Sequence, residues 1–294
     1  MTRGVLMYAH NNAEIDYFKI ASANALMVQK NLKVPVTLVT DNTALKIAKS
    51  TLGEKFINKC FDQIVIKQIQ YFDNKRVFSD TSHTTKSLQF YNCNHWEAYE
   101  LSPYDETLFI DADYLIMSSA LNNCWGSEPD VMINHRIFEP GTAKDPHSKF
   151  IDDFGIRQYW ATVIYFKKTV FANFVFEIVK HIQENYFYYR QLYYFSNGMF
   201  RNDYAFSIAM HMLGGFTDND ADVNELPITG LLMSWDTNDI YEINGINDIT
   251  LYVEKADKGT YMLARLKDQD VHIMNKWAIN RHADKLIELY KDAV

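Results

Sequence analysis

The sequence predicts an α/β fold with a mostly parallel central sheet flanked by helices. The chain has 294 residues, of which 48% are hydrophobic, enough for one large α/β domain with a sizeable core. Its first half alternates between short, β-branched apolar runs and longer segments with helical spacing. Acidic residues follow two of the apolar runs, at the edge where ligands gather in such sheets.

The first half contains four strand-like runs separated by helical segments. After Glu14, for example, Ile15, Phe18 and Ala21 fall near one face of a helix. The expected strands are 4–9, 34–41, 62–69 and 106–116, and the expected helices are 14–32, 42–56 and 86–101. A polar loop, 72–85, is expected before the last of these helices.

The second half is less regular. A loop rich in proline, glycine and charge, Ile133–Gly155, is long enough for a flexible lid. The expected strands are 159–166, 226–235, 249–255 and 270–276, and the expected helices are 169–195 (one helix or a pair), 202–215 and 281–293. Because no repeat or linker interrupts the pattern, we expect a single domain, 1–294.

Composition narrows the class of function. The formal charge of −8 and the pI near 5.6 argue against a broad nucleic-acid footprint, which needs clustered Lys and Arg. Three cysteines without CxxC spacing indicate a reducing compartment rather than a disulfide framework. No apolar run approaches the roughly 20 residues of a membrane span, so we expect a cytoplasmic protein without a transmembrane segment.

Two aspartates stand at the centre of the apolar run ETLFIDADYLI. On a strand, Asp111 and Asp113 would face the same side, with the small Ala112 between them. Two carboxylates placed in this way hold Mg²⁺ or Mn²⁺ and leave coordination positions for phosphate oxygens. The alternative is an acidic turn or helix cap just past a strand.

A second polar element, DVHIMNKW, lies near the end of the chain. His272 offers a neutral nitrogen ligand to a metal, and Lys276 offers a point charge to a diphosphate. Taken alone, this element is more typical of a hydrogen-bonded core histidine followed by a solvated lysine.

Together, FIDAD and HIMNKW resemble two motifs of GT-A glycosyltransferases of the glycogenin-like family 8, which includes lipopolysaccharide galactosyltransferases. HIMNKW is shorter than the family's H-F-x-G-x-x-K-P-W element and lacks its glycine and proline. The resemblance implies the GT-A (nucleotide-diphospho-sugar transferase) fold, with 1–120 as a nucleotide-binding half and 121–294 as an acceptor-binding half. It implies Asp111, Asp113 and His272 as ligands of Mn²⁺ or Mg²⁺, and Lys276 as a diphosphate contact.

The same resemblance implies four further donor contacts. Tyr8 would stack on the base, and Asn11 or Asp41 would hydrogen-bond it. The alternative for Asp41 is an N-cap of the following helix. Lys86, on the helix expected before the aspartate pair, would reach the donor, or else is a solvated lysine at a helix start.

A polar pair in NGMFRNDYAF matches the position that the family places beside the sugar. Asn202 would lie under the anomeric carbon in a retaining enzyme, and Asp203 would be the general base in an inverting one. The alternative for both is a helix cap. Trp160 and the aromatic tract Tyr186–Phe195 are candidates for an acceptor platform, although helical spacing assigns most of the tract to the core.

The expected function is metal-dependent transfer of a sugar from a nucleotide-diphosphate sugar, UDP-sugar favoured, to an acceptor hydroxyl. The acceptor is a glycan, a lipid-linked saccharide or a protein, and a nucleic acid ranks last because the chain is acidic. The rivals are a phosphatase, whose aspartate pair normally opens the domain, and a nucleotidyltransferase, whose Gly-rich first loop is absent here. A third is a sugar-nucleotide-binding protein without turnover.

Overall fold

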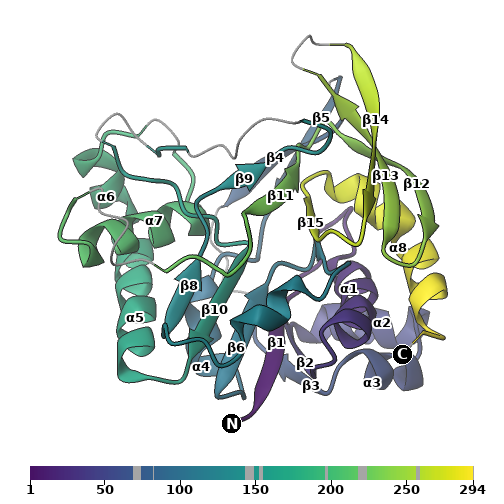
Figure 1. The fold of residues 1–294 in the computed structure, drawn as a ribbon, viewed down its shortest axis with the longest axis horizontal. Helices are drawn as coiled ribbons and strands as arrows, with labels where there is room; N and C mark the ends of the chain where they lie inside the picture. The colour runs from purple at the N-terminus through teal and green to yellow at the C-terminus, as the bar shows by residue number, and fades with distance from the viewer. Residues whose placement is uncertain are drawn as a thin grey trace.

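The computed structural model describes residues 1–68, 74–81, 83–142, 149–151, 155–195, 198–217, 224–255 and 259–293. Its largest sheet has six strands in the order β3-β2-β1-β6-β10-β8 (Figure 1). The strands are β1 (Arg3–Tyr8), β2 (Val36–Thr40), β3 (Gln63–Ile66), β6 (Glu106–Ile110), β8 (Val131–Ile133) and β10 (Val163–Lys167). The first four run parallel, and β10 is antiparallel to both of its neighbours. The prediction of a mostly parallel central sheet flanked by helices is therefore confirmed.

Alternate residues of each central strand enter opposite hydrophobic layers. On β1, Val5 and Met7 belong to one buried cluster, and Leu6 and Tyr8 belong to the other. Such a strand is apolar on both faces because helices cover both sides of a largely parallel sheet. This explains why its sequence shows a continuous apolar run rather than strict alternation.

Two groups of helices cover the two faces (Figure 1). The first layer contains α1 (Tyr17–Asn31), α2 (Asn42–Thr51), α3 (Glu54–Cys60) and α8 (Lys276–Tyr290). The second contains α4 (Ala98–Leu101), α5 (Val170–Glu184), α6 (Tyr186–Leu192) and α7 (Asn202–Leu213). The segment 169–195 is thus a pair of helices. Within the described residues, no helix combines the length and apolarity that a membrane span requires.

A smaller sheet, in the order β7-β15-β11-β9, joins the middle of the chain to its end. Its strands are β7 (Tyr114–Leu115), β15 (Val271–Ile273), β11 (Leu231–Ser234) and β9 (Ile137–Phe138). β15 pairs antiparallel with β7 so that His272 lies opposite Tyr114. The sheet therefore places the C-terminal histidine next to the segment that leaves β6.

The predictions for 72–85 and 86–101 are wrong. These residues contain a hairpin of β4 (Lys75–Thr81) and β5 (Thr84–Gln89), and the only helical parts of 86–101 are a 3-10 turn at His95–Glu97 and α4. Most residues of the hairpin are polar because its surface is largely exposed. The sequence therefore contains no apolar run that would predict these two strands.

Another antiparallel sheet was only partly anticipated. It contains β12 (Asp239–Gly245), β13 (Asp248–Glu254) and β14 (Tyr261–Lys267), of which the sequence predicts β13 alone. The edge strands carry charged, exposed residues, so their sequences lack the apolar alternation that predicts a strand.

A second 3-10 turn lies at Ala120–Cys124. Residues 143–148 and 152–154 of the expected lid, Ile133–Gly155, lie outside the described residues, and its described part includes β9.

Asp41 caps α2, so we expect Asp41→Ala to lower the free energy of unfolding by about 1 kcal/mol. Its Oδ1 accepts hydrogen bonds from the backbone N–H groups of Thr43 (2.8 Å) and Ala44 (3.0 Å). Urea unfolding measures the change, and Asp41→Asn, which keeps an oxygen acceptor, is the control. Equal loss in both variants would contradict the capping role.

Candidate active site

The aspartate pair lies in a turn, not on a strand. β6 ends at Ile110, the backbone N–H of Asp111 donates to the carbonyl of Thr162, and that of Tyr114 donates to the carbonyl of Asp111. The prediction that strand geometry aligns the two carboxylates is therefore wrong. They approach one another because the chain turns tightly between β6 and β7, at the carboxyl edge of the parallel strands.

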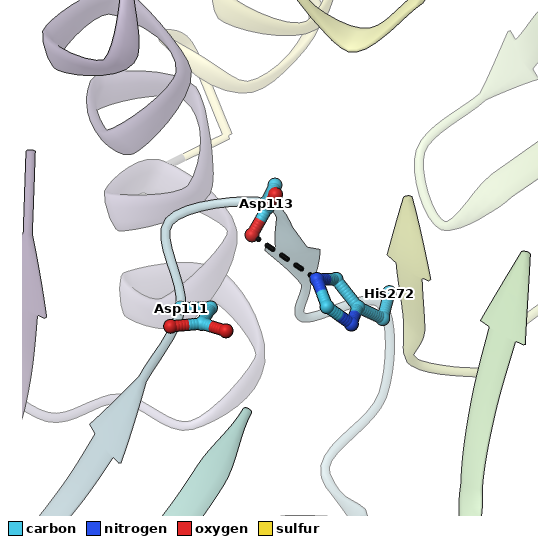
Figure 2. Close-up of side chains that lie close together, drawn as sticks. All are labelled: Asp111, Asp113 and His272. Carbon is cyan, nitrogen blue, oxygen red and sulfur yellow. Dashed lines mark ion pairs between the residues drawn. The ribbon is translucent and has the colours of Figure 1, made fainter. Parts of the chain in front are cut away.

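The structure brings His272 to this turn (Figure 2). One ligand atom from each of Asp111, Asp113 and His272 lies within 4.8 Å of the other two. His272 Nε2 is 3.3 Å from Asp113 Oδ1, while Nδ1 is 3.3 Å from the hydroxyl of Thr162. A proton on Nδ1, donated to Thr162, leaves the Nε2 lone pair facing the carboxylates.

Charge in the cluster is unevenly distributed. Burial alone would raise the pKa of Asp113, but Lys276 and His272 outweigh it and hold that pKa well below its usual range. The Lys276 ammonium contacts Asp113 Oδ2 directly. Burial raises the pKa of Asp111, and the neighbouring Asp113 raises it further. The turn thus holds one firmly ionised carboxylate, Asp113, and a second, Asp111, that forms no ion pair with a lysine or arginine among the described residues.

These three residues fit a divalent cation. His272 Nε2 is buried and has no hydrogen-bond partner among the described residues, although it faces a carboxylate oxygen. Two carboxylates with one imidazole suit Mn²⁺, and the carboxylates also suit Mg²⁺. Lys276 contacts Oδ2 of Asp113, whereas Oδ1 of this carboxylate lies on the side of His272.

The cluster lies on the wall of a cavity of about 350 Å³. This volume falls within the usual range for small-molecule sites, roughly 300–1,000 Å³. Eight buried side-chain atoms without a hydrogen-bond partner in the described chain belong to residues that line this cavity. They are Tyr8 Oη, Tyr17 Oη, Arg76 Nε, His95 Nδ1, Trp160 Nε1, Arg201 Nε, Asn202 Oδ1 and His272 Nε2. Unpaired polar atoms are costly in a closed core, so their concentration here indicates a site for a polar ligand.

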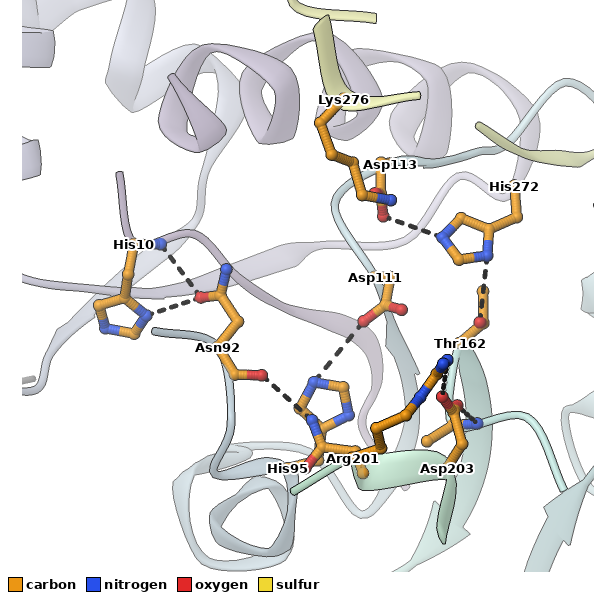
Figure 3. Close-up of polar contacts among 12 residues, drawn as sticks. His10, Asn92, His95, Asp111, Asp113, Thr162, Arg201, Asp203, His272 and Lys276 are labelled. Atoms are coloured by element: carbon orange, nitrogen blue, oxygen red, sulfur yellow. Dashed lines mark hydrogen bonds and ion pairs between the residues drawn. The ribbon is translucent and has the colours of Figure 1, made fainter. Parts of the chain in front are cut away.

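Asp203 and Arg201 form an ion pair on the opposite side of Asp111 from Lys276 (Figure 3). Arg201 Nη2 donates to Asp203 Oδ2 at 2.9 Å, and Asp203 Oδ1 accepts from the backbone N–H of Ala161 at 3.0 Å. Burial alone would raise the pKa of Asp203, but Arg201 lowers it below the usual value. Asp203 is therefore held as a paired anion, which makes it a weak base.

Asn202 is fixed with its oxygen unpaired. Its Nδ2 donates to the backbone carbonyl of Asn92 at 3.1 Å, and Asn92 Oδ1 in turn accepts from the backbone N–H and Nδ1 of His10 (Figure 3). This network orients the amide of Asn202, whose buried Oδ1 has no partner in the described chain. Asn202 is thus an acceptor on the cavity wall, available to a ligand hydroxyl.

The other predicted donor contacts divide into two groups. Tyr8 lines the cavity, with its ring edge-on to His95 and Phe109. Asn11 and Asp41 lie outside the lining.

Asn11 and Asp41 instead serve at helix starts. Asn11 Nδ2 donates to the α1 N-cap residue Asp16, and its Oδ1 accepts from the N–H of Phe18. Asp41 is the N-cap of α2, so the capping alternative is confirmed.

Lys86 is absent from the cavity lining and is not on a helix. It lies on β5, more than half exposed, with its ammonium 2.8 Å from Glu14. The basic residue that the hairpin does contribute to the cavity is Arg76, on β4. Sequence reasoning missed Arg76 because it assigned this segment to a loop.

Trp160 lines the cavity, but no residue of Tyr186–Phe195 does. Tyr189 and Phe195 are buried in the core, as helical spacing indicates, whereas Phe187 and Tyr188 are exposed. Of the predicted aromatic platform, the structure therefore places only Trp160 at the site.

His95 is a lining residue that the sequence did not single out. Its Nε2 is 3.6 Å from Asp111 Oδ1, and burial lowers the pKa of His95 to about 3, so the ring is neutral. It is close enough to Asp111 to orient that carboxylate but adds no charge. The motif NHWE carries no pattern that distinguishes such a histidine from a core residue.

Comparison with known proteins gives only distant likenesses. No family model and no curated protein matches the chain. Among solved structures it is similar to the apo-form glycosyltransferase GlyE of Streptococcus pneumoniae TIGR4, at 13% identity and a TM-score of 0.39, covering 77% of this chain. It spans 45% of that GlyE chain.

Two further solved structures are similar over about as much of the chain. The galactosyltransferase LgtC, in complex with donor and acceptor sugar analogues, shows 11% identity and a TM-score of 0.40, covering 70% of each chain. The PaToxG glycosyltransferase shows 13% identity and a TM-score of 0.38, covering 72% of this chain and 69% of its own. Likenesses of this size do not establish a shared fold, so a function has to be argued from the site itself.

The ion pair of Asp203 predicts a pH-dependent contribution to stability. Because folding lowers the pKa of this carboxyl, the pair stabilises the fold above the ordinary Asp pKa of about 3.9 and is lost as pH falls through the lowered value. We expect Asp203→Asn to cost about 2 kcal/mol at pH 7, with the difference from wild type shrinking as pH is lowered below the ordinary Asp pKa. Urea unfolding at several pH values measures this, and a constant difference would contradict the assignment.

Proposed function

We propose that the protein is a metal-dependent glycosyltransferase that moves a sugar from a nucleotide-diphosphate sugar, UDP-sugar favoured, to an acceptor hydroxyl. One observation carries the proposal: Asp111, Asp113 and His272 converge at the carboxyl edge of a mostly parallel sheet, beside Lys276 and a polar cavity. This arrangement suits a GT-A enzyme of the family 8 type. In it, residues 1–120 supply most of the nucleotide site and 121–294 supply the acceptor side.

Asp111, Asp113 and His272 would hold Mn²⁺ or Mg²⁺. When bound, the cation neutralises negative charge on the diphosphate as the sugar bond breaks. Thr162 keeps the imidazole oriented for this role, and His95 faces Asp111 from the other side. Both contacts favour a pre-formed ligand set.

Lys276 would bind the diphosphate. It is the first residue of α8, a 15-residue helix whose N-terminus carries partial positive charge. Its side chain is only 12% exposed and its ammonium contacts Asp113. When Asp113 is engaged in holding a cation, this ammonium would be available to the phosphate of the leaving nucleotide.

Asn202 is the better candidate for contact with the reacting sugar. Its Oδ1 is unpaired and its amide is fixed through Asn92, whereas Asp203 already accepts two hydrogen bonds and carries a lowered pKa. Asp203 would then position Arg201 and the Ala161 backbone rather than take a proton. The remaining lining, with Tyr8 and Trp160, would surround the base and the sugars.

The acceptor is proposed to be a glycan, a lipid-linked saccharide or a protein. A nucleic-acid acceptor ranks last because the chain carries a formal charge of −8. The competing functions are a sugar-nucleotide-binding protein without turnover and a phosphatase or nucleotidyltransferase that uses the same metal site.

Asp113→Asn tests the metal site. We expect Mn²⁺-dependent binding of UDP in wild type by titration calorimetry, and slow hydrolysis of a UDP-sugar, with both lost in the variant and in wild type with EDTA. Circular dichroism and thermal unfolding check that the variant folds. Turnover that persists in EDTA would refute the metal role, and binding without hydrolysis or transfer would favour a non-catalytic protein.

Lys276→Met should change metal and nucleotide binding in opposite directions. Removing the ammonium frees Asp113, so Mn²⁺ alone should bind more tightly, whereas UDP in saturating Mn²⁺ should bind about tenfold more weakly or worse. Lys285→Met, on the exposed side of the same helix, is the control. If both affinities fall together, Lys276 has only a structural role.

A further inference from the structure

Two arginines line the cavity together with the metal-site cluster. Arg76 comes from β4 and Arg201 from the residue that precedes α7, and both line the cavity. The Nε atoms of both are buried without a hydrogen-bond partner in the described chain. The charge of Arg201 is neutralised by Asp203. The positive charge of Arg76 therefore remains to be explained.

Arg76 has no carboxylate partner among the described residues. Its guanidinium lies over the ring of Phe90, with Cζ 3.6 Å from the ring centroid. Burial lowers the pKa of Arg76, and the nearby Arg201 lowers it further, so its surroundings do not favour its charge. Its strand neighbour Lys75, by contrast, is exposed to solvent.

A cation held in this way suits an anionic ligand. The Arg76 side chain is partly buried. A charge that is partly withdrawn from water without a charged partner is unfavourable, and the stacking on Phe90 offsets only part of that cost. The planar face of a guanidinium that stacks on a ring leaves its N–H edge for a carboxylate or phosphate. The N-terminus of α7, a 12-residue helix without a side-chain cap, adds partial positive charge beside Arg201.

The diphosphate is not expected to be this anion. In the proposed function the diphosphate lies with the cation and Lys276, beside Asp113 and His272. Figure 3 shows Arg201 and Asp203 on the far side of Asp111 from Lys276. Arg76 lies close enough to Arg201 for the two positive charges to disfavour one another. A substrate whose diphosphate lies with the cation and Lys276 would therefore present its sugar, or the acceptor, to this pair of arginines.

Resting on the proposed function, we propose that Arg76, assisted by Arg201, recognises an anionic group, a carboxylate or a phosphate, on a sugar bound in the cavity. The sugar is either the one transferred from the donor, as in a uronic-acid donor, or part of the acceptor. Arg76 is thus a specificity-determining residue, and a neutral hexose leaves it without a partner.

The first experiment compares two donors that differ only at C6. Titration calorimetry with Mn²⁺ measures UDP, UDP-glucose and UDP-glucuronic acid against wild type, Arg76→Gln and Arg76→Lys. If the anion is on the donor sugar, wild type should bind UDP-glucuronic acid about tenfold more tightly than UDP-glucose. Arg76→Gln should remove this preference and leave the affinity for UDP unchanged. Arg76→Lys keeps the charge but lacks the planar fork, so it should retain only part of the preference.

The second experiment uses free sugars and does not depend on the donor. Glucose, glucuronic acid and glucose 6-phosphate are titrated into the protein with and without UDP and Mn²⁺. If the anion is on the acceptor, the two charged sugars should bind at least tenfold more tightly than glucose, and Arg76→Gln should abolish the difference. Lys75→Gln, an equal change of charge on the adjacent exposed residue of β4, should behave as wild type in both experiments.

The outcomes separate this inference from the proposed function. Failure of UDP to bind with Mn²⁺ would overturn the proposed function, while the free-sugar titration would still decide the role of Arg76. Binding of UDP without preference for a charged sugar in either experiment would overturn the anion subsite alone. Equal weakening of UDP and UDP-glucuronic acid in Arg76→Gln would also overturn it, because Arg76 would then contact the diphosphate.

Discussion

The candidate site depends on the pairing of two very short strands, β7 and β15, which lie more than 150 residues apart in the chain. His272 lies opposite Tyr114 in this pairing, and the backbone N–H of Ile273 donates to the carbonyl of Asp113 at 3.0 Å. A two-residue strand contributes few backbone hydrogen bonds, so other contacts must fix it. Asp270 Oδ1 accepts from the N–H groups of Met117 and Ser118, which join the entrance of β15 to the exit of β7.

From the other side, α1 holds the same segment. Asn24 donates to the carbonyl of Tyr114 and accepts from the N–H of Ile116, in place of a neighbouring strand. Three parts of the chain thus converge on a short segment immediately after the aspartate pair. The separation between the imidazole and the carboxylates is thus set by the strand pairing together with the side chains of Asn24 and Asp270 that hold its backbone, which favours a pre-formed site.

Sequence reasoning found the central strands and the polar cluster, but not the cavity wall. β1, β2 and β6 are apolar on both faces, so their runs are conspicuous, and Asp111, Asp113 and His272 stand out as polar residues beside such runs. The β4–β5 hairpin has no buried run and was assigned to a loop and a helix. For that reason the sequence favours Lys86 as the basic donor contact, whereas the structure brings Arg76 to the cavity.

Asn11 and Asp41 show a different limit. A polar residue after a strand suits a ligand contact and a helix cap equally well, and only the backbone geometry distinguishes these two roles.

In the proposed enzyme, Asp111 and Asp113 from the middle of the chain and His272 from near its end hold one cation next to a diphosphate. Crystals soaked with Mn²⁺ and UDP, measured at the manganese absorption edge, test this most directly. We expect an anomalous peak within about 2.0–2.4 Å of oxygens of Asp111 and Asp113 and of Nε2 of His272, with a phosphate oxygen of UDP in the same coordination sphere. A peak elsewhere, or UDP bound with its phosphates away from this cluster, would contradict it.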